Sequence, residues 1–268
     1  MKTNALVLLL PVVFLSCTSE PRDRHGPANG SPHALRVLAY NIHHGEGMDK
    51  QLDLERIATL IKDSGADVVT LQEIDEGCKR TGGVDQATRL GKLTGMHHAF
   101  GPFFDYQGGR YGMALLSKRP LENVRNIRLP DGAEPRTALV ATVTLDGGRR
   151  VTIAGIHLYR TGEERLAQAD KLMASLADEP HPTILAGDFN SRPGDPVMRA
   201  LGRRYVIVPK NGSSFTFPST GPNREIDYLL IRRDAPLQAR SCRVLDERVA
   251  SDHRPLLTDL AWTERDEP

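Results

Sequence analysis

The feature of this sequence that most constrains its fold is a series of short apolar segments with polar side chains in or beside them. The segments have the length and composition of buried β-strands, and most of the polar residues follow a strand, whereas Asp227 lies within one and His253 precedes another. These polar residues are Asn41, Glu73, His157, Asp188, Asn190, Asp227 and His253. Loops that follow strands on a rigid scaffold often carry function, so we expect one site at one rim.

Between these segments the sequence shows both helical periodicity and hairpin turns. Helices are predicted over residues 54–64, 86–94 and 163–177. Strands are predicted over residues 35–40, 68–71, 112–117, 137–145, 151–157, 183–186, 226–231 and 255–262. Asp53 and Gly65 are the expected N-cap and stop of the first helix. Strands joined by both helices and hairpins predict an α/β fold, with packed mixed sheets and helices outside.

The first residues predict export. Lys2 precedes an apolar run over residues 5–15, which is too short to span a bilayer but suits a secretory signal peptide over residues 1–16. The segment 14–17 resembles a bacterial lipobox, which implies cleavage before Cys17 and lipid attachment to its sulfur. A plain secretory signal is the alternative. We therefore expect an exported lipoprotein of the cell envelope, bound to a membrane through its lipid, or otherwise a secreted protein.

A polar segment separates this signal from the rest of the chain. Residues 17–33 are rich in Pro and Gly and lack periodicity, which predicts a flexible tether. The folded domain is then expected over residues 34–264. Cys78 and Cys242 could pair in an oxidising compartment, but two separate thiols are the favoured interpretation.

The charge distribution does not suggest a long nucleic-acid partner. The chain has 35 Lys and Arg against 34 Asp and Glu, and its basic residues are scattered among acidic ones. Proteins that bind the nucleic-acid backbone need clustered basic residues, so nucleic acid is expected only as a substrate. No protein partner is predicted, and we expect a monomer.

The carboxylates and amides at the strand ends suit metal-assisted hydrolysis. Asn41 and Glu73 offer the hard oxygen ligands that Mg²⁺ or Mn²⁺ prefers. Asp188 and Asn190 are two residues apart, so they are expected to point the same way across a strand. Each residue alone has a structural alternative, such as capping a turn. Their joint occurrence favours a catalytic site.

The histidines supply the acid–base candidates. Asp227 and His253 form a potential pair, because a carboxylate that binds one ring nitrogen raises the basicity of the other. His157 is a second imidazole at a strand end. His43 and His44 are of the type that binds zinc, but no Cys or carboxylate at a suitable spacing completes such a site.

The order of the motifs resembles that of the endonuclease/exonuclease/phosphatase superfamily, which includes deoxyribonuclease I and the neutral sphingomyelinases. The resemblance covers residues 35–262. Its motifs are Tyr40-Asn41-Ile42-His43, Leu71-Gln72-Glu73-Ile74, Tyr111-Gly112-Met113-Ala114-Leu115-Leu116-Ser117, Glu134-Pro135-Arg136, Ile156-His157-Leu158, Gly187-Asp188-Phe189-Asn190, Ile226-Asp227-Tyr228 and Ser251-Asp252-His253-Arg254-Pro255. The resemblance implies a deoxyribonuclease I-like four-layer α/β sandwich that hydrolyses phosphate esters with a divalent cation.

The resemblance also implies roles for the metal and water side of the site. Asn41 and Glu73 would hold Mg²⁺ or Mn²⁺, with Asp252 as an additional ligand. Asp188 and Asn190 would orient the attacking water and the scissile phosphate. Members of the superfamily differ in whether this aspartate or the histidine is the general base, and the sequence leaves both open.

The remaining implied roles concern the phosphate. His253, steadied by Asp227, would act on the water as a base or stabilise the transition state. His157 would donate to a phosphate oxygen, and Tyr111 and Arg136 match positions on the phosphate side. For an exported protein with balanced charge, a small or lipid-borne phosphodiester is the favoured substrate. A secreted nuclease is the alternative, and a non-catalytic binding module is a third.

Overall fold

The computed structural model describes residues 34–263 of the chain. The predicted signal peptide, the lipidation at Cys17 and the tether lie outside these residues. No helix within residues 34–263 is both long and apolar enough to cross a membrane. Cys78 and Cys242 are buried and not bonded to each other.

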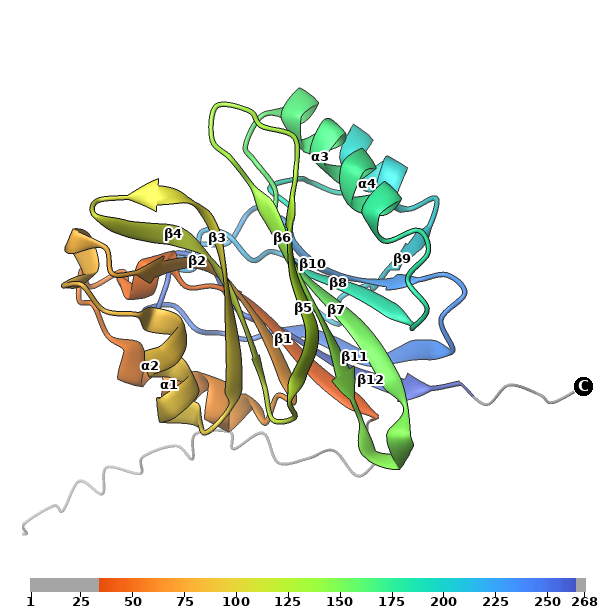
Figure 1. The fold of residues 1–268 in the computed structure, drawn as a ribbon, viewed down its shortest axis with the longest axis horizontal. Helices are drawn as coiled ribbons and strands as arrows, with labels where there is room; N and C mark the ends of the chain where they lie inside the picture. The colour runs from red at the N-terminus through yellow and green to blue at the C-terminus, as the bar shows by residue number, and fades with distance from the viewer. Residues whose placement is uncertain (1–33, 264–268) are drawn as a thin grey trace, which may run out of the picture. The chain divides into compact units, whose positions relative to one another are not determined.

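Two six-stranded mixed sheets form the centre of the domain (Figure 1). One sheet has the strand order β11-β12-β1-β2-β4-β3, and the other has the order β5-β6-β7-β8-β10-β9. The strands of the first are β1 (Leu35–Asn41), β2 (Val68–Glu76), β3 (His97–Tyr106), β4 (Gly109–Ser117), β11 (Leu237–Val244) and β12 (Leu256–Trp262). The strands of the second are β5 (Leu121–Arg128), β6 (Thr137–Thr144), β7 (Arg150–His157), β8 (Thr183–Asp188), β9 (Tyr205–Ile207) and β10 (Asp227–Arg232).

Both sheets have a parallel pair at the centre, β1 with β2 in one and β7 with β8 in the other. A parallel connection needs a crossover, and helices supply it here. Helix α1 (Leu54–Ser64) connects the first pair, and α3 (Gly162–Ser175) connects the second. The same local arrangement is therefore present in each sheet.

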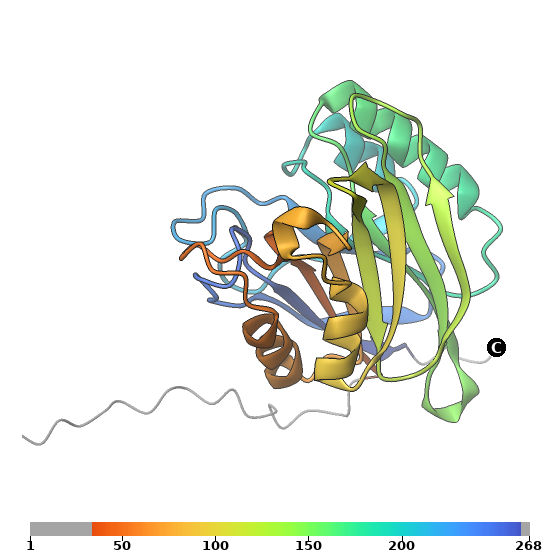
Figure 2. The ribbon, with the colours of Figure 1, turned by 60° about the vertical axis from the view of Figure 1, so that its left-hand side comes forward.

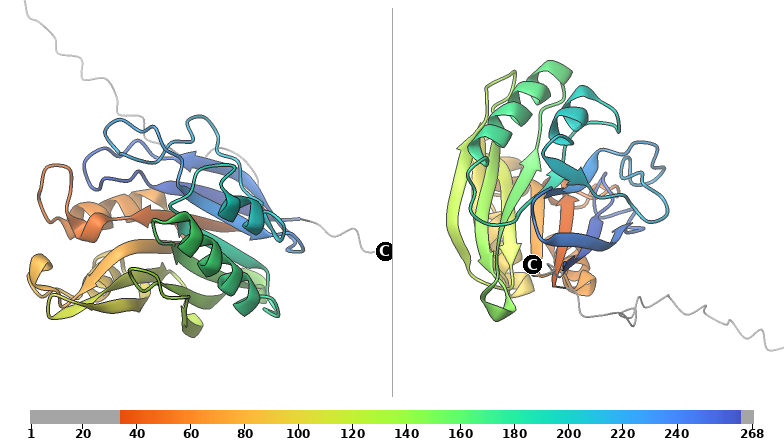
Figure 3. Two further views of the ribbon diagram at one scale, coloured as in Figure 1. Left: turned by 90° about the horizontal axis from the view of Figure 1, so that it is seen from above. Right: turned by 90° about the vertical axis from the view of Figure 1, so that its right-hand side faces the viewer.

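Helices cover the outer faces. Helices α1 and α2 (Gln86–Thr94) lie against the first sheet, and α3 and α4 (Pro196–Leu201) lie against the second. Figure 2 shows the two helix pairs on opposite sides of the molecule, and both views in Figure 3 keep them apart. One apolar layer fills the space between the sheets, and two more lie beneath the helices. The predicted four-layer α/β sandwich is confirmed.

The ends of α1 follow the signals in the sequence. The Asp53 carboxylate accepts a hydrogen bond from the backbone N–H of Arg56, and Gly65 ends the helix in the left-handed conformation with φ 67°. An N-cap of this kind satisfies a donor that the helix leaves unpaired. The predicted N-cap and stop are therefore confirmed.

Gly187 positions the end of β8 through a close approach to β7. Its φ is +143°, and an added Cβ would lie 2.1 Å from the carbonyl oxygen of Ile156. That oxygen belongs to the neighbouring backbone, which cannot move without breaking the strand pairing. We expect Gly187→Ala to lower the free energy of unfolding by about 3 kcal/mol or more, measured by urea denaturation.

Gly194→Ala is the matched control, because Gly194 also has a positive φ (+84°) but no atom lies within 4 Å of an added Cβ. That substitution carries the backbone strain alone, about 1–2 kcal/mol. Equal losses for the two variants would contradict the role given to the approach of β7 and β8.

Candidate active site

The central strands of both sheets deliver polar side chains to one rim. β1 ends at Asn41, β7 ends at His157 and β8 ends at Asp188. Glu73 lies within β2 at a β-bulge between Gln72 and Ile74, where its own φ is +60°. Bulges often re-aim a side chain beside a functional site. The two sheets thus contribute to one cluster.

The amide of Asn41 links the carboxylates of the two sheets. Its Nδ2 donates to Glu73 Oε1 at 3.0 Å and to Asp188 Oδ2 at 3.3 Å. The same nitrogen lies 3.5 Å from His253 Nε2. Its Oδ1 accepts from the backbone N–H of His43 at 3.1 Å, which fixes the orientation of the amide. Asn41 is therefore the centre of the cluster.

His253 and Asp227, the predicted acid–base pair, are in contact. His253 Nδ1 donates to Asp227 Oδ2 at 3.0 Å, and its Nε2 lies 3.7 Å from Asp188 Oδ2. Asp227 is the register partner of Asp188 on the antiparallel neighbour β10. Asp227 thus fixes the ring so that the other nitrogen faces the cluster.

The charges in this cluster shift the pKa values of its members. Burial alone would lower the pKa of His253, but Asp227, Asp188 and Asp252 together raise it to about 10. Burial, and next to it the charge of Asp227, raises the pKa of Asp188 to about 7. A cationic imidazole therefore lies beside a carboxyl group that titrates near neutral pH.

Asn190 is placed differently from the prediction. The strand ends at Asp188, and Asn190 has a left-handed φ of 49°, so the two side chains do not share a strand face. The backbone N–H of Asn190 donates to Asp188 Oδ1 at 2.8 Å, and its Nδ2 donates to the carbonyl of Leu158 at 2.9 Å. Asn190 therefore holds the Asp188 carboxylate, while a contact with phosphate stays a prediction.

His157 joins the cluster from β7. Its Nε2 lies 3.6 Å from Asp188 Oδ2, and its buried Nδ1 has no hydrogen-bond partner within residues 34–263. Burial, Arg136 and His253 lower the pKa of His157 well below its usual value. This imidazole is therefore neutral and retains one donor.

Tyr111 and Arg136 meet at Phe103, an aromatic residue that the sequence did not single out. The ring centroids of Phe103 and Tyr111 are 5.6 Å apart, and the Arg136 guanidinium lies 4.9 Å from the centre of the Phe103 ring. Arg136 also pairs with Glu134 at 2.8 Å. Burial raises the pKa of Tyr111 well above its usual value, so its hydroxyl keeps its proton.

Asp252 stands apart from the closely spaced ligand atoms. Within residues 34–263, it belongs to neither of the two groups of His and acidic side chains whose ligand atoms lie within 4.8 Å of one another. Its Oδ1 accepts from the hydroxyl of Ser251 at 3.3 Å. Its charge raises the pKa of His253. A role as a metal ligand stays a prediction.

The oxygen ligands around Asn41 fit a hard divalent cation. One amide nitrogen lies within 3.3 Å of oxygens from both Glu73 and Asp188, so two carboxylates converge, one of them fully buried. Converging carboxylates favour a counter-charge, and His253, 3.7 Å from Asp188, supplies part of it. Magnesium usually takes one or two carboxylates together with a substrate phosphate. The donor set therefore suits such an ion.

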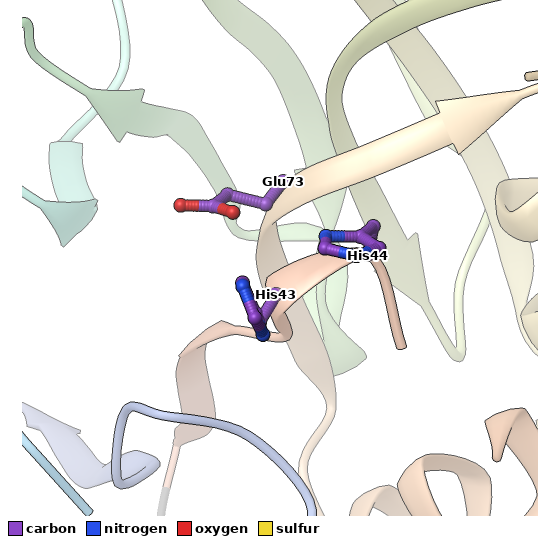
Figure 4. A group of neighbouring side chains, drawn as sticks. All are labelled: His43, His44 and Glu73. Atoms are coloured by element: carbon purple, nitrogen blue, oxygen red, sulfur yellow. The ribbon is translucent and has the colours of Figure 1, made fainter. Parts of the chain in front are cut away.

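A second group of ligands contradicts an expectation from the sequence. His43, His44 and Glu73 have ligand atoms within 4.8 Å of one another, and Figure 4 shows both imidazoles beside the Glu73 side chain. The expectation that no carboxylate completes a histidine site is therefore wrong. The carboxylate comes from β2, which lies parallel to β1. Only the pairing of these two strands could have revealed it.

Solved structures with a similar fold act on or bind different anions. The human Nocturnin catalytic domain, solved with a bound sulfate anion, has a TM-score of 0.66 and 21% identity, covering 86% of this chain and 94% of that one. A mannosyl-6-phosphatase from Bacteroides thetaiotaomicron has a TM-score of 0.66 and 16% identity, covering 85% of this chain and 100% of that one. At such identities the likeness shows the fold alone.

The fold together with this rim of carboxylates, amide and imidazoles defines a hydrolase of the phosphoesterase and nuclease type. The chain belongs to the Endonuclease/Exonuclease/phosphatase family, whose model matches residues 38–253. The uncharacterized protein YbhP of Escherichia coli K12 is 24% identical over 243 residues, covering 85% of this chain and 96% of that protein.

Proposed function

We propose that the protein is a phosphodiesterase that uses Mg²⁺, or Mn²⁺, and acts on a small or lipid-borne phosphodiester outside the cytoplasm. The single observation that carries this proposal is the contact between the His253–Asp227 pair and the Asn41–Asp188 cluster. An acid–base pair and cation ligands then reach the same reacting atoms. Export as a lipoprotein through Cys17 and a monomeric state belong to the same proposal.

Each residue of the cluster has a separate role in the proposed hydrolysis. Asp188 orients the attacking water and takes its proton, since its carboxyl group titrates near neutral pH. His253, held by Asp227, stabilises the negative charge that develops on the phosphorus centre. A divalent cation at Glu73 would neutralise charge on the phosphate and leaving-group oxygens. Asn41 would join its ligands only if its amide turned, because Oδ1 here accepts from the backbone N–H of His43.

Other donors complete the environment of the phosphate. His157 offers a neutral N–H next to Asp188, and Tyr111 offers a protonated hydroxyl. Arg136 is 4% exposed, so its guanidinium acts where water screens it little. These groups would bind the non-bridging oxygens, which carry most of the charge.

Exposed apolar side chains near the rim support a lipid-borne substrate. Met48 and Leu52, which follow His44 in the chain, are 38% and 50% exposed, and Val249, shortly before His253, is 43% exposed. The backbone N–H of Met48 donates to the carbonyl of Val249 at 2.7 Å, which joins the two loops. Exposed apolar side chains beside a polar site can mark contacts with protein, membrane or ligand, and the proposal takes lipid as the contact here.

Chelation and a substrate panel test the proposal. Purified protein should hydrolyse bis-p-nitrophenyl phosphate with Mg²⁺ or Mn²⁺, lose this activity in EDTA because the phosphate charge is no longer neutralised, and regain it when Mg²⁺ is restored. Sphingomyelin, phosphatidylinositol and glycerophosphodiesters should be hydrolysed faster than plasmid DNA or RNA.

Two results would count against it. Activity that persists unchanged in the chelator contradicts the metal requirement. Rapid nicking of DNA without turnover of lipid or small diesters contradicts the substrate class and favours a secreted nuclease.

A further inference from the structure

We propose that His43, His44 and Glu73 form a binding site for a Zn²⁺-type transition-metal ion, next to the oxygen ligands at Asn41. The inference rests on the proposed function only in that Glu73 serves both sites. The three ligand atoms lie within 4.8 Å of one another (Figure 4). Two imidazoles and a carboxylate are ligands that zinc accepts and that magnesium does not prefer.

The His43 ring is already oriented as a ligand. Its Nδ1 lies 3.2 Å from the backbone carbonyl of Glu46, which can only accept, so Nδ1 carries the proton. The lone pair is then on Nε2. Metal-binding histidines almost always donate their other ring N–H to a carbonyl or carboxylate in this way.

The His44 ring has an unsatisfied nitrogen. The side chain is buried, with 9% of the residue exposed, and its Nδ1 has no hydrogen-bond partner within the part of the chain that the structure describes. Its Nε2 lies 3.9 Å from the Glu46 carboxylate. A buried polar atom without a partner costs about 1–3 kcal/mol. A bound cation would satisfy this nitrogen.

The backbone holds both rings in place at an energetic cost. His43 and His44 have φ values of 47° and 45°, and Glu73 has a φ of 60°. The carbonyl of His44 accepts a hydrogen bond from Gln86 Nε2 at 2.7 Å, which fixes this segment to α2. Non-glycine residues in this region are strained, and such strain persists mainly where a site requires it.

The ligand set also explains how two ions could share one carboxylate. Glu73 Oε1 accepts from the Asn41 amide at 3.0 Å, and one oxygen of this carboxylate lies within 4.8 Å of the histidine ligand atoms. Two His and one carboxylate leave coordination positions open, as in transition-metal sites that bind water or substrate. Glu73 would then be a ligand that both ions could share, and paired ions act together in many hydrolases of phosphate esters.

Zinc titration of the full chain, without a polyhistidine tag and with Mg²⁺ in excess, tests the inference. Competition with a chromogenic chelator should show one Zn²⁺ bound per chain. Nitrogen-15 spectra of the imidazoles should shift at His43 Nε2 and His44 Nδ1. His43→Gln and His44→Gln should each weaken Zn²⁺ binding by at least about 100-fold, since even loss of an orienting partner costs 10–100-fold. His97→Gln, at an exposed histidine outside the site, should not weaken it.

The outcomes separate this inference from the proposed function. Unchanged Zn²⁺ affinity in the double variant His43→Gln/His44→Gln, or imidazole shifts confined to His157 and His253, would overturn it. If the variants fail to fold, as judged by circular dichroism, the nitrogen shifts of the wild-type protein decide alone. Zinc binding at these atoms with no hydrolysis of any phosphodiester would refute the proposed function and leave the metal site standing.

Discussion

Replacing His253 with alanine is expected to lower kcat for phosphodiester hydrolysis by roughly 10²–10³-fold, the usual loss when a donor that stabilises transition-state charge is removed. The imidazole lies 3.7 Å from Asp188 and is held by Asp227. It is therefore placed to stabilise the negative charge that the phosphate gains in the transition state. KM should change little. Steady-state kinetics with bis-p-nitrophenyl phosphate and Mg²⁺ would measure both constants.

The pH profile gives this prediction a second readout. The carboxylates around His253 raise its pKa to about 10, so the cationic form is present below that pH. Wild-type kcat should therefore fall as the pH rises through about 10, and the variant should lack this fall. His97→Ala, at an exposed histidine, is the matched control. Near-full turnover in folded His253→Ala protein would show that the Asp227–His253 pair is wrongly assigned.

Replacing Asp188 with asparagine should reduce kcat by about 10³-fold or more, because the change removes the general base. It also puts an amide, which itself carries N–H donors, where the surrounding N–H groups need an acceptor. Asp188 Oδ2 faces Asn41 Nδ2, His157 Nε2 and His253 Nε2 in the wild-type protein. Kinetics and Mg²⁺ titration would be measured together, since this carboxylate also belongs to the cation ligands. Asp170→Asn on the exposed face of α3 is the control.

The Asp188 variant should also change both limbs of the pH profile. Wild-type kcat should fall as the pH drops through about 7 or below, because Asp188 must be ionised and a bound cation lowers its pKa. The variant should lose this acid limb. Its alkaline limb should move to lower pH, because Asp188 is one of the charges that raise the pKa of His253. An unchanged acid limb would assign the base to another group.

Strand ends with polar residues were predictable from the sequence, while several strands were not. β5 is an edge strand, and its sequence shows little apolar periodicity because it includes the charged residues Glu122, Arg125 and Arg128. β3 carries Pro102 beside a bulge, and β11 has a bulge between Ala239 and Ser241 that interrupts the alternation of its side chains. Local sequence patterns cannot reveal pairing that depends on a neighbouring strand.

The site could be predicted as a set of residues but not as a geometry. Asn41, Asp188 and His253 are identifiable because each follows or precedes a clear strand. The left-handed turn at Asn190 depends on its bond to Asp188, which no periodicity encodes. The closeness of His43 to Glu73 depends on β1 lying beside β2, and this pairing is set by the strand order of the whole sheet.

Because each sheet has its own parallel pair and each pair carries part of the site, activity depends on how far the chain has folded. Asn41 and Glu73 come from one sheet, whereas Asp188, Asp227 and His157 come from the other. A chain that has assembled only the first sheet can form the contact between Asn41 and Glu73 but lacks the contact between Asn41 and Asp188. Catalysis therefore requires that the two sheets have packed against each other, and a partly folded chain does not hydrolyse phosphate esters.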